Sequence, residues 1–152
     1  MDIQIRGIQE DELPTALALV ERVFLLFEAP DYSQQGVDTF RAFLQDRESV
    51  AALTLLGAFA GDALVGVLAM RGESHIALFF VEREMQGKGV GRALFSAARA
   101  ACPGDFMTVN SSPYAVKIYK RLGFSPLSDE QEKDGIRFTP MKCLLVSGGN
   151  AQ

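Results

Sequence analysis

Hydrophobic and polar positions change their period along the chain, and each period predicts a different element. Residues 2–8, DIQIRGI, alternate between apolar and polar side chains, which predicts a half-buried strand. Behind the acidic stretch QEDE, apolar residues recur at helical spacing and predict an amphipathic helix: Leu13, Leu17, Val20, Phe24 and Phe27. Val37, Phe40 and Leu44 mark a second, shorter helix, for which Ser33 is a suitable N-cap.

The middle of the chain carries three short and nearly continuous apolar runs. They cover residues 51–60, 63–71 and 75–81 and predict strands that are buried on both faces. Gly61 and Asp62 separate the first two runs, which is a hairpin signal. Three neighbouring strands of one sheet are therefore expected here.

Helical and extended patterns alternate after the third run. Helical spacing begins at Val90 and ends near Pro103, and residues 105–110, DFMTVN, predict the next strand. Residues 111–124 begin with serine at the N-cap, place proline in the first turn and basic residues late, and have Gly123 just past the end. This punctuation predicts a second short helix.

The last alternating segment, residues 135–146, predicts a closing strand, with Pro140 at a bulge or a sheet edge. The order βααβββαβαβ, with one further strand possible, predicts a mixed α/β fold: a central sheet of six to seven strands and about four helices. No composition shift or linker divides the chain before its tail. We therefore expect a single domain over residues 1–146 and a flexible tail over residues 147–152.

Composition narrows the functional classes. With 152 residues, 48% of them hydrophobic, the chain is about one domain long. The net charge of −4 argues against a nucleic-acid partner, and no apolar run is long enough to span a membrane. Cys102 and Cys143 lack the spacing of a metal site or a neighbouring histidine, so we expect inert packing thiols, no metal and a cytoplasmic location.

Three glycines, Gly87, Gly89 and Gly91, stand directly before a predicted helix. The first amides of a helix have no intrahelical partners and carry partial positive charge, so a loop that enters the helix can bind phosphate. Glycines let the backbone approach a pyrophosphate closely, and Lys88 and Arg92 add charge at the rim. This pattern predicts a diphosphate site; the alternative is a glycine turn that only caps the helix.

The sequence QGKGVG, residues 86–91, resembles the QxxGxG signature of the GNAT superfamily of acyl-CoA-dependent N-acetyltransferases. Residues 110–124 are similar to that family's second motif, in which Ala115 is followed four positions later by Tyr119. The resemblance implies a mostly antiparallel sheet whose fourth and fifth strands splay apart around acetyl-CoA. It implies these cofactor-binding residues: Phe80, Val81, Gln86, Gly87, Lys88, Gly89, Val90, Gly91, Arg92, Asn110, Ser112, Ala115 and Tyr119.

Amine acetylation needs a base, because an alkyl ammonium is almost fully protonated at neutral pH. His75 titrates near neutrality and lies eleven residues before Gln86, the offset at which several family members carry a base, usually glutamate. Glu73 is the reserve candidate, and water is a third possibility. Backbone amides at the end of the strand near Phe80 and Val81 are candidate oxyanion donors.

The resemblance also implies that Tyr119 is the acid that protonates the leaving CoA thiolate. Many relatives carry asparagine where this chain has Ser112, which leaves a CoA hydrogen bond open there, and Asn110 is a substitute.

The acceptor groove of the family is formed by segments that correspond here to residues 27–40 and 128–138, and both are acidic. Their carboxylates suit a cationic amine, although solvated loop charges are the commoner explanation for such residues: Glu28, Asp31, Asp129, Glu130 and Glu132. We therefore expect acetyl transfer from acetyl-CoA to a primary amine of a small molecule, in a monomer or homodimer. Acetylation of a protein amine and a non-catalytic acyl-CoA sensor are the alternatives.

Overall fold

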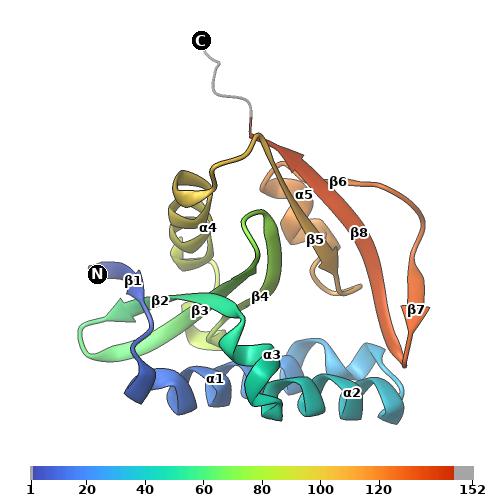
Figure 1. The fold of residues 1–152 in the computed structure, drawn as a ribbon, viewed down its shortest axis with the longest axis horizontal. Coiled ribbons are helices and arrows are strands. Elements are labelled where there is room, and N and C mark those ends of the chain that lie inside the picture. The colour runs from blue at the N-terminus through green and yellow to red at the C-terminus, as the bar shows by residue number, and fades with distance from the viewer. Residues whose placement is uncertain (1, 146–152) are drawn as a thin grey trace.

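The computed structural model describes residues 2–145 and shows a mixed α/β fold (Figure 1). The sheet is open and mostly antiparallel, with helices on both faces. Within the described residues the strands are β1 (Ile3–Gly7), β2 (Leu53–Ala60), β3 (Ala63–Arg71), β4 (His75–Val81), β5 (Phe106–Ser111), β6 (Ser125–Pro126), β7 (Gln131–Lys133) and β8 (Ile136–Leu144). The α-helices are α1 (Leu13–Phe27), α2 (Gln34–Gln45), α3 (Arg47–Ala51), α4 (Val90–Ala101) and α5 (Val116–Arg121). Short 3-10 helices cover Glu10–Glu12, Ala29–Asp31 and Arg83–Met85.

The strands are arranged in the order β1-β2-β3-β4-β5-β8-β6, and β7 pairs with the other end of β8. Among the strand pairs of residues 2–145, only β4 and β5 are parallel, and they pair over two positions, His75 with Thr108 and Ile76 with Val109. Beyond those pairs the two strands separate, which confirms the expected splay. Along the gap between them, the backbone N–H and C=O groups at the end of β4 have no neighbouring strand to pair with.

Two hydrophobic clusters cover the two faces of the sheet. One contains Leu94 and Phe95 of α4 together with Met107 of β5. The other contains Leu19 and Phe24 of α1 and the opposite face of β3 and β4. Figure 1 shows the same division, with α4 on one side of strands β1 to β4 and α1 and α2 on the other.

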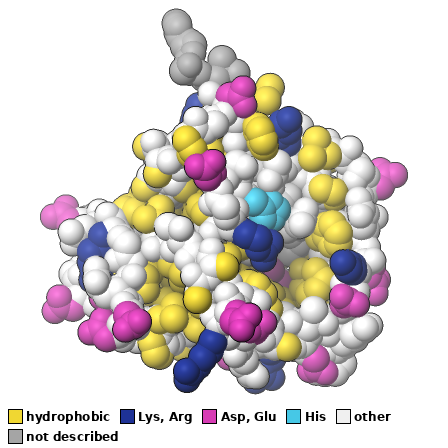
Figure 2. Space-filling view, in the orientation of Figure 1, with side chains coloured by type: hydrophobic (Ala, Val, Ile, Leu, Met, Phe, Trp, Pro, Cys, Tyr) yellow, Lys and Arg dark blue, Asp and Glu magenta, His cyan; other side chains and the backbone are white. Residues whose placement is uncertain are grey.

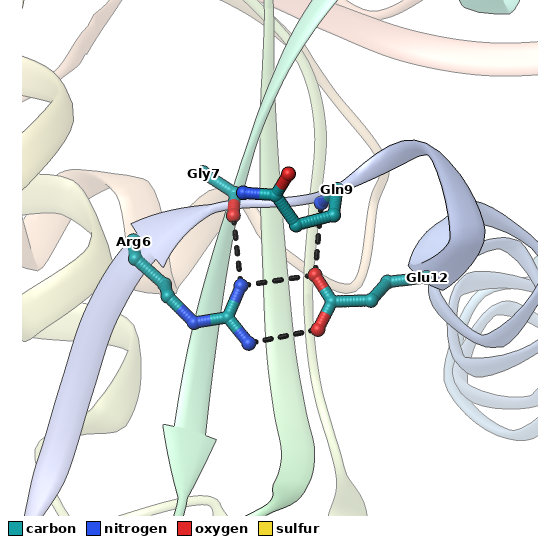
Figure 3. A network of polar contacts seen from close by, with 4 residues as sticks. All are labelled: Arg6, Gly7, Gln9 and Glu12. Atoms are coloured by element: carbon teal, nitrogen blue, oxygen red, sulfur yellow. Dashed lines mark hydrogen bonds and ion pairs between the residues drawn. The ribbon is translucent and has the colours of Figure 1, made fainter.

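The beginning of α1 is fixed to β1 by one polar network (Figure 3). Arg6 donates from Nη1 to Glu12 Oε1 at 2.9 Å and from Nη2 to Oε2 at 2.7 Å, and the backbone N–H of Gln9 donates to the same carboxylate at 2.8 Å. The Arg6 guanidinium, whose ion pair is the largest cause, holds the pKa of Glu12 down at about 2. This network orients the helix whose other end reaches the candidate site.

The start of α2 and the connection before it pack against the β7–β8 turn and the start of β8. A Cβ atom at Gly36 would lie 2.1 Å from the carbonyl oxygen of Gly135, so the two backbones touch. Thr39 Oγ1 donates to the Asp134 carbonyl at 2.7 Å, and Arg137 Nη1 donates to the Asp31 carbonyl at 3.0 Å. The two acidic segments expected to border an acceptor groove are therefore joined to each other.

Most predicted elements are confirmed, including Ser33 as the N-cap of α2, where its hydroxyl accepts from the Gly36 amide at 3.3 Å. The helix predicted from Ser111 is wrong at its start, because α5 begins at Val116. Ser112 instead caps a turn, accepting from the Ala115 amide at 3.2 Å. The short elements α3, β6 and β7 were not predicted.

Pro140 lies neither at a bulge nor on an edge strand, since β8 has β5 on one side and β6 and β7 on the other. It lies between the part of β8 that pairs with β6 and the part that pairs with β7. On that side no strand pairs with β8 at Pro140, so the sheet loses no hydrogen bond through the N–H that proline lacks.

Lys and Arg side chains are scattered among Asp and Glu on the face shown in Figure 2 and do not gather into one basic patch. No helix within residues 2–145 is long and apolar enough to cross a membrane. The predicted flexible tail lies outside the described residues.

Candidate active site

The glycine loop leads from β4 into α4. Gly87 and Gly89 have φ of 77° and 87°, in the left-handed region that favours glycine, and Gly89 is the N-cap of α4. A Cβ atom at either position would meet nothing within 4 Å, so protein packing does not fill the space above them. Gly91 differs, because its φ is not positive and it lies in the first turn of the helix.

Unpaired amides line the entrance to α4. The first intrahelical bond runs from Ala93 N to Gly89 O at 3.0 Å, so the amides of Val90, Gly91 and Arg92 precede the helical ladder. Lys88 and Arg92 are exposed beside them. The loop therefore has the open space, the donors and the charge that a pyrophosphate requires.

The edge of β4 supplies further backbone groups. The N–H of Glu82 donates to the carbonyl of Val65 on the neighbouring strand β3 at 2.9 Å. Because N–H directions alternate along an extended chain, the amides of Phe79 and Val81 point the other way, into the gap beside β5. The Val81 carbonyl lies on the same side and accepts from Gln86 Nε2 at 3.1 Å. Phe79 was not among the predicted residues, and the alternation favours it over Phe80 as an amide donor.

A cavity of about 470 Å³ opens at this gap. Its walls come from the end of α1, the end of β4, the glycine loop and α5, and its volume is typical of a small-molecule site. Predicted residues that line it are Phe80, Val81, Gln86, Gly87, Gly91, Ala115 and Tyr119. Residues that line it and were not predicted to bind the cofactor include Val23, Phe27, Glu28, Phe79, Tyr114, Lys117, Ile118 and Arg121.

Tyr119 contributes the buried phenol of this cavity. It is 6% exposed and packs between Phe79 and Phe124, with ring centroids 6.0 Å and 5.3 Å away. Burial first, and then the Glu28 charge, raise the pKa of Tyr119 far above its ordinary value. The phenol therefore stays protonated near neutral pH and is available to donate a hydrogen bond.

Tyr114 lines the cavity and is also exposed to solvent. Its ring stacks on Phe27 with centroids 5.2 Å apart, and its hydroxyl donates to Gln86 Oε1 at 3.3 Å. Gln86 also donates a hydrogen bond to the Val81 carbonyl. These contacts connect the end of α1, the turn before α5 and the glycine loop.

Glu28 is the carboxylate of the cavity. It follows the last residue of α1 and is partly buried. Burial, the largest cause, and the Asp31 charge raise its pKa to about 7, and the nearby Ser112 hydroxyl lowers it in part. Sequence reasoning named Glu28 only as one of several acidic loop residues, because nothing in a local pattern shows that α1 ends beside α5.

His75 and Glu73 lie at the other end of β4. His75 is the first residue of the strand, five positions before Phe80, which is roughly 16 Å along an extended chain. Its Nδ1 hydrogen-bonds the Thr108 hydroxyl at 2.9 Å, and burial together with Arg71 lowers its pKa. Glu73 is exposed in the β3–β4 turn. Neither side chain lines the cavity, and the role of His75 as base stays a prediction.

The remaining predicted positions fall into two groups. Ser112 is 7% exposed and lies near Glu28, whereas Asn110 is exposed on β5. Cys102 and Cys143 are free thiols outside the cavity, and burial raises the pKa of Cys143. Among residues 2–145, no three His, Cys, Asp or Glu side chains cluster as a metal site would require.

A splayed sheet with a glycine loop and a buried tyrosine at the gap defines a class of acetyltransferase, and comparison with known proteins supports it. The family model described as "Acetyltransferase (GNAT) domain" matches residues 28–145, so the chain belongs to the GNAT acetyltransferases and is an enzyme of that family. This confirms the resemblance seen in the two sequence motifs.

Among curated proteins, the chain is similar to two named peptidyl-lysine N-acetyltransferase YjaB. It is 29% identical to that of Salmonella typhimurium over 55% of this chain and 58% of the relative, so the match spans little more than half the relative's length. It is 27% identical to that of Escherichia coli over 80% of each chain.

Among solved structures, a GCN5-related N-acetyltransferase from Rhodopseudomonas palustris has a TM-score of 0.82 at 21% identity, covering 95% of this chain and 97% of that one. The PaiA N-acetyltransferase from Thermoplasma acidophilum, solved with coenzyme A, has a TM-score of 0.77 at 18% identity, covering 95% and 99%.

Proposed function

We propose that this protein transfers an acetyl group from acetyl-CoA directly to a primary amine in a ternary complex. The observation that carries the proposal is the cavity at the β4–β5 gap, where the glycine loop and the buried phenol of Tyr119 border one space. One end of that space suits a pyrophosphate, and the other holds a carboxylate that suits an ammonium group.

The residues present fit acetyl-CoA. Unpaired amides at Val90, Gly91 and Arg92 would hold the pyrophosphate, and Lys88 adds charge beside them. The gap-facing backbone of β4 would pair with the pantetheine amides in place of a missing strand. The exposed apolar side chain of Ile118, 37% exposed at the cavity wall, would then be covered by the ligand.

Tyr119 is the proposed donor to the leaving thiolate. A thiol has a pKa near 8.5, well below that of a buried phenol, so complete proton transfer from Tyr119 is uphill and a strengthening hydrogen bond is the main contribution. The amides of Phe79 and Val81 are proposed to stabilise the oxyanion that forms when the amine attacks.

The acceptor is proposed to be a primary alkyl amine of a small molecule. The cavity wall near Glu28 carries Val23 and Phe27, which suit an aliphatic stem below a charged head. A peptidyl lysine is the second candidate acceptor, because two relatives are named for that activity and a lysine side chain has the same shape and charge.

The test is the release of free CoA thiol from acetyl-CoA in the presence of a panel of polyamines, amino acids and lysine peptides. Amine-dependent release together with an N-acetylated product supports acetyl transfer, and the preferred amine identifies the acceptor class. CoA binding without thiol release for any amine would instead indicate a non-catalytic acyl-CoA sensor.

A further inference from the structure

We propose that Glu28 binds the ammonium group of the acceptor and accepts its proton. This inference rests on the proposed acetyl transfer and names the base for it. The base would then lie at the end of α1 and not at His75 on β4, the position that the family resemblance favours.

The backbone fixes the position of Glu28. Its N–H donates to the Phe24 carbonyl at 2.9 Å, and its own carbonyl accepts from the Asp31 amide at 3.0 Å, where the next 3-10 helix begins. The residue is thereby fixed between two helices, and it lines the cavity. Tyr119, the proposed donor to the thiolate, lines the same cavity from α5.

The surroundings leave the carboxylate in need of a cation. Among the ion pairs within residues 2–145, none includes Glu28, although Lys117 and Arg121 also line the cavity. A partly buried carboxylate without a cationic partner is costly to keep. An ammonium ligand would relieve that cost at the place where the reaction needs the amine.

The groups that act on Glu28 come from three neighbouring segments. Asp31 follows it in the next turn, the Ser112 hydroxyl approaches after β5, and its own charge acts on Tyr32, Tyr114 and Tyr119. Burial and the Asp31 charge raise the pKa of Glu28 to about 7 and outweigh the opposite effect of the Ser112 hydroxyl. A base with this pKa is half ionised near neutral pH and still basic enough to take a proton.

His75 is less suited to a cationic acceptor. Burial first, and then the Arg71 charge opposite it in the β3–β4 register, lower the pKa of His75, so an ammonium group there would meet a positive charge. Its Nδ1 is already engaged with the Thr108 hydroxyl. Glu28 offers the opposite charge and lines the cavity.

The proton balance is complete with the groups named. Glu28 takes one proton from the ammonium, and the neutral amine then forms the C–N bond to the acetyl carbon. As the C–S bond breaks, the second surplus proton of the nitrogen ends on the departing sulfur, which Tyr119 stabilises by hydrogen bonding. Glu28 finally returns its proton to solvent, which leaves the amide, CoA thiol and one released proton.

The experiment measures kcat/KM for the best amine as a function of pH, with acetyl-CoA affinity by calorimetry and the melting temperature as controls. Glu28→Gln keeps the size of the side chain and removes the charge. We expect kcat/KM at neutral pH to fall by about a hundredfold or more, with unchanged acetyl-CoA affinity. The rise in rate through about pH 7 should vanish and be replaced by a steady increase as the amine itself deprotonates.

Asp31→Asn is the matched control, because it removes a neighbouring charge that does not line the cavity. It should keep the maximal rate and move the rise in rate to lower pH, since Asp31 raises the pKa of Glu28. His75→Gln is measured in parallel. Loss of the pH-dependent rise in His75→Gln with its retention in Glu28→Gln would overturn the proposal and assign the base to His75.

An unaltered profile in both variants would also overturn the proposal and leave water as the base. A wild-type protein that acetylates no amine would instead contradict the proposed function itself, so the two failures are distinguishable.

Discussion

The Phe27 ring lies against the Tyr114 ring with centroids 5.2 Å apart and planes inclined by 24°. Phe27 ends α1, whereas Tyr114 precedes α5, so this pair joins two parts of the cavity wall that are distant in sequence. Tyr114 also donates to Gln86 at the glycine loop. The stacked pair therefore forms part of the cavity wall next to the glycine loop.

Removing the Tyr114 ring should weaken acetyl-CoA binding more than it lowers the stability of the protein. Tyr114→Ala should raise the KM of acetyl-CoA by up to about tenfold, because an aromatic pair contributes about 0.5 to 1.5 kcal/mol. Tyr114→Phe keeps the ring and loses only the hydroxyl contact with Gln86, so its KM should stay within about threefold of wild type. Equal effects of the two substitutions would show that the hydroxyl, and not the stacking, matters.

A substitution at Gly91 tests whether a glycine is needed there for CoA binding and not for the backbone conformation. A Cβ atom there would lie 3.6 Å from Phe79, an ordinary contact, and the backbone has no positive φ. Gly91→Ala should therefore keep or raise stability, by up to about 1 kcal/mol, while weakening CoA binding about tenfold or more. Calorimetry and thermal melts measure both effects. Gly104→Ala, which also has room and an ordinary φ, should leave CoA affinity unchanged.

The tyrosine hydroxyl is tested by Tyr119→Phe, which keeps the ring between Phe79 and Phe124. Turnover should fall by about a hundredfold, toward the lower end for acid catalysis, because the buried phenol donates mainly a hydrogen bond. Acetyl-CoA affinity should barely change. If Tyr119→Phe kept the wild-type rate in single-turnover experiments, where chemistry limits the rate, Tyr119 would not be the donor to the thiolate and solvent would take that role.

The raised pKa of Glu28 also predicts how stability depends on pH. The folded state binds this proton more tightly than the unfolded chain, so the stabilisation is complete below about pH 4.5 and is lost as pH rises through about 7. At about pH 8, Glu28→Gln should be more stable than wild type by roughly 2 to 3 kcal/mol, and at about pH 4.5 the two should melt alike.

Denaturant titrations at both pH values measure this difference. Glu12→Gln is a control of opposite sign, because Arg6 lowers the pKa of Glu12 to about 2. That substitution should destabilise the protein at neutral pH, and its effect should shrink as pH falls toward 2.

The sequence predicts the parts of this fold that local periodicity encodes. The long strands and α1, α2 and α4 have clear periods, and Gly87 and Gly89 have the positive φ that their place before a helix indicates. The start of α5 was misjudged because Ser112 and Pro113 suit a helix N-terminus and a preceding turn equally well. Strands β6 and β7 are short, exposed and polar, and form only because β8 offers them a partner.

The sequence predicts those site residues that belong to a motif within one segment. It does not predict contacts between segments that are distant in sequence. Gln86 and Tyr119 belong to motifs that one stretch of sequence contains. Glu28 acquires its surroundings from α1, the Ser112 turn and α5, and only the folded chain brings these together. Gly36 and Gly135 touch for the same reason, across a contact that no local pattern records.

A crystal structure of the protein with CoA tests the proposed site most directly. We expect the pyrophosphate to contact the amides of residues 87–92 and the pantetheine to lie in the gap between β4 and β5. The sulfur should lie within hydrogen-bond distance of the Tyr119 hydroxyl. A CoA molecule that binds outside this gap, or whose sulfur points away from Tyr119 and Glu28, would contradict the proposed site.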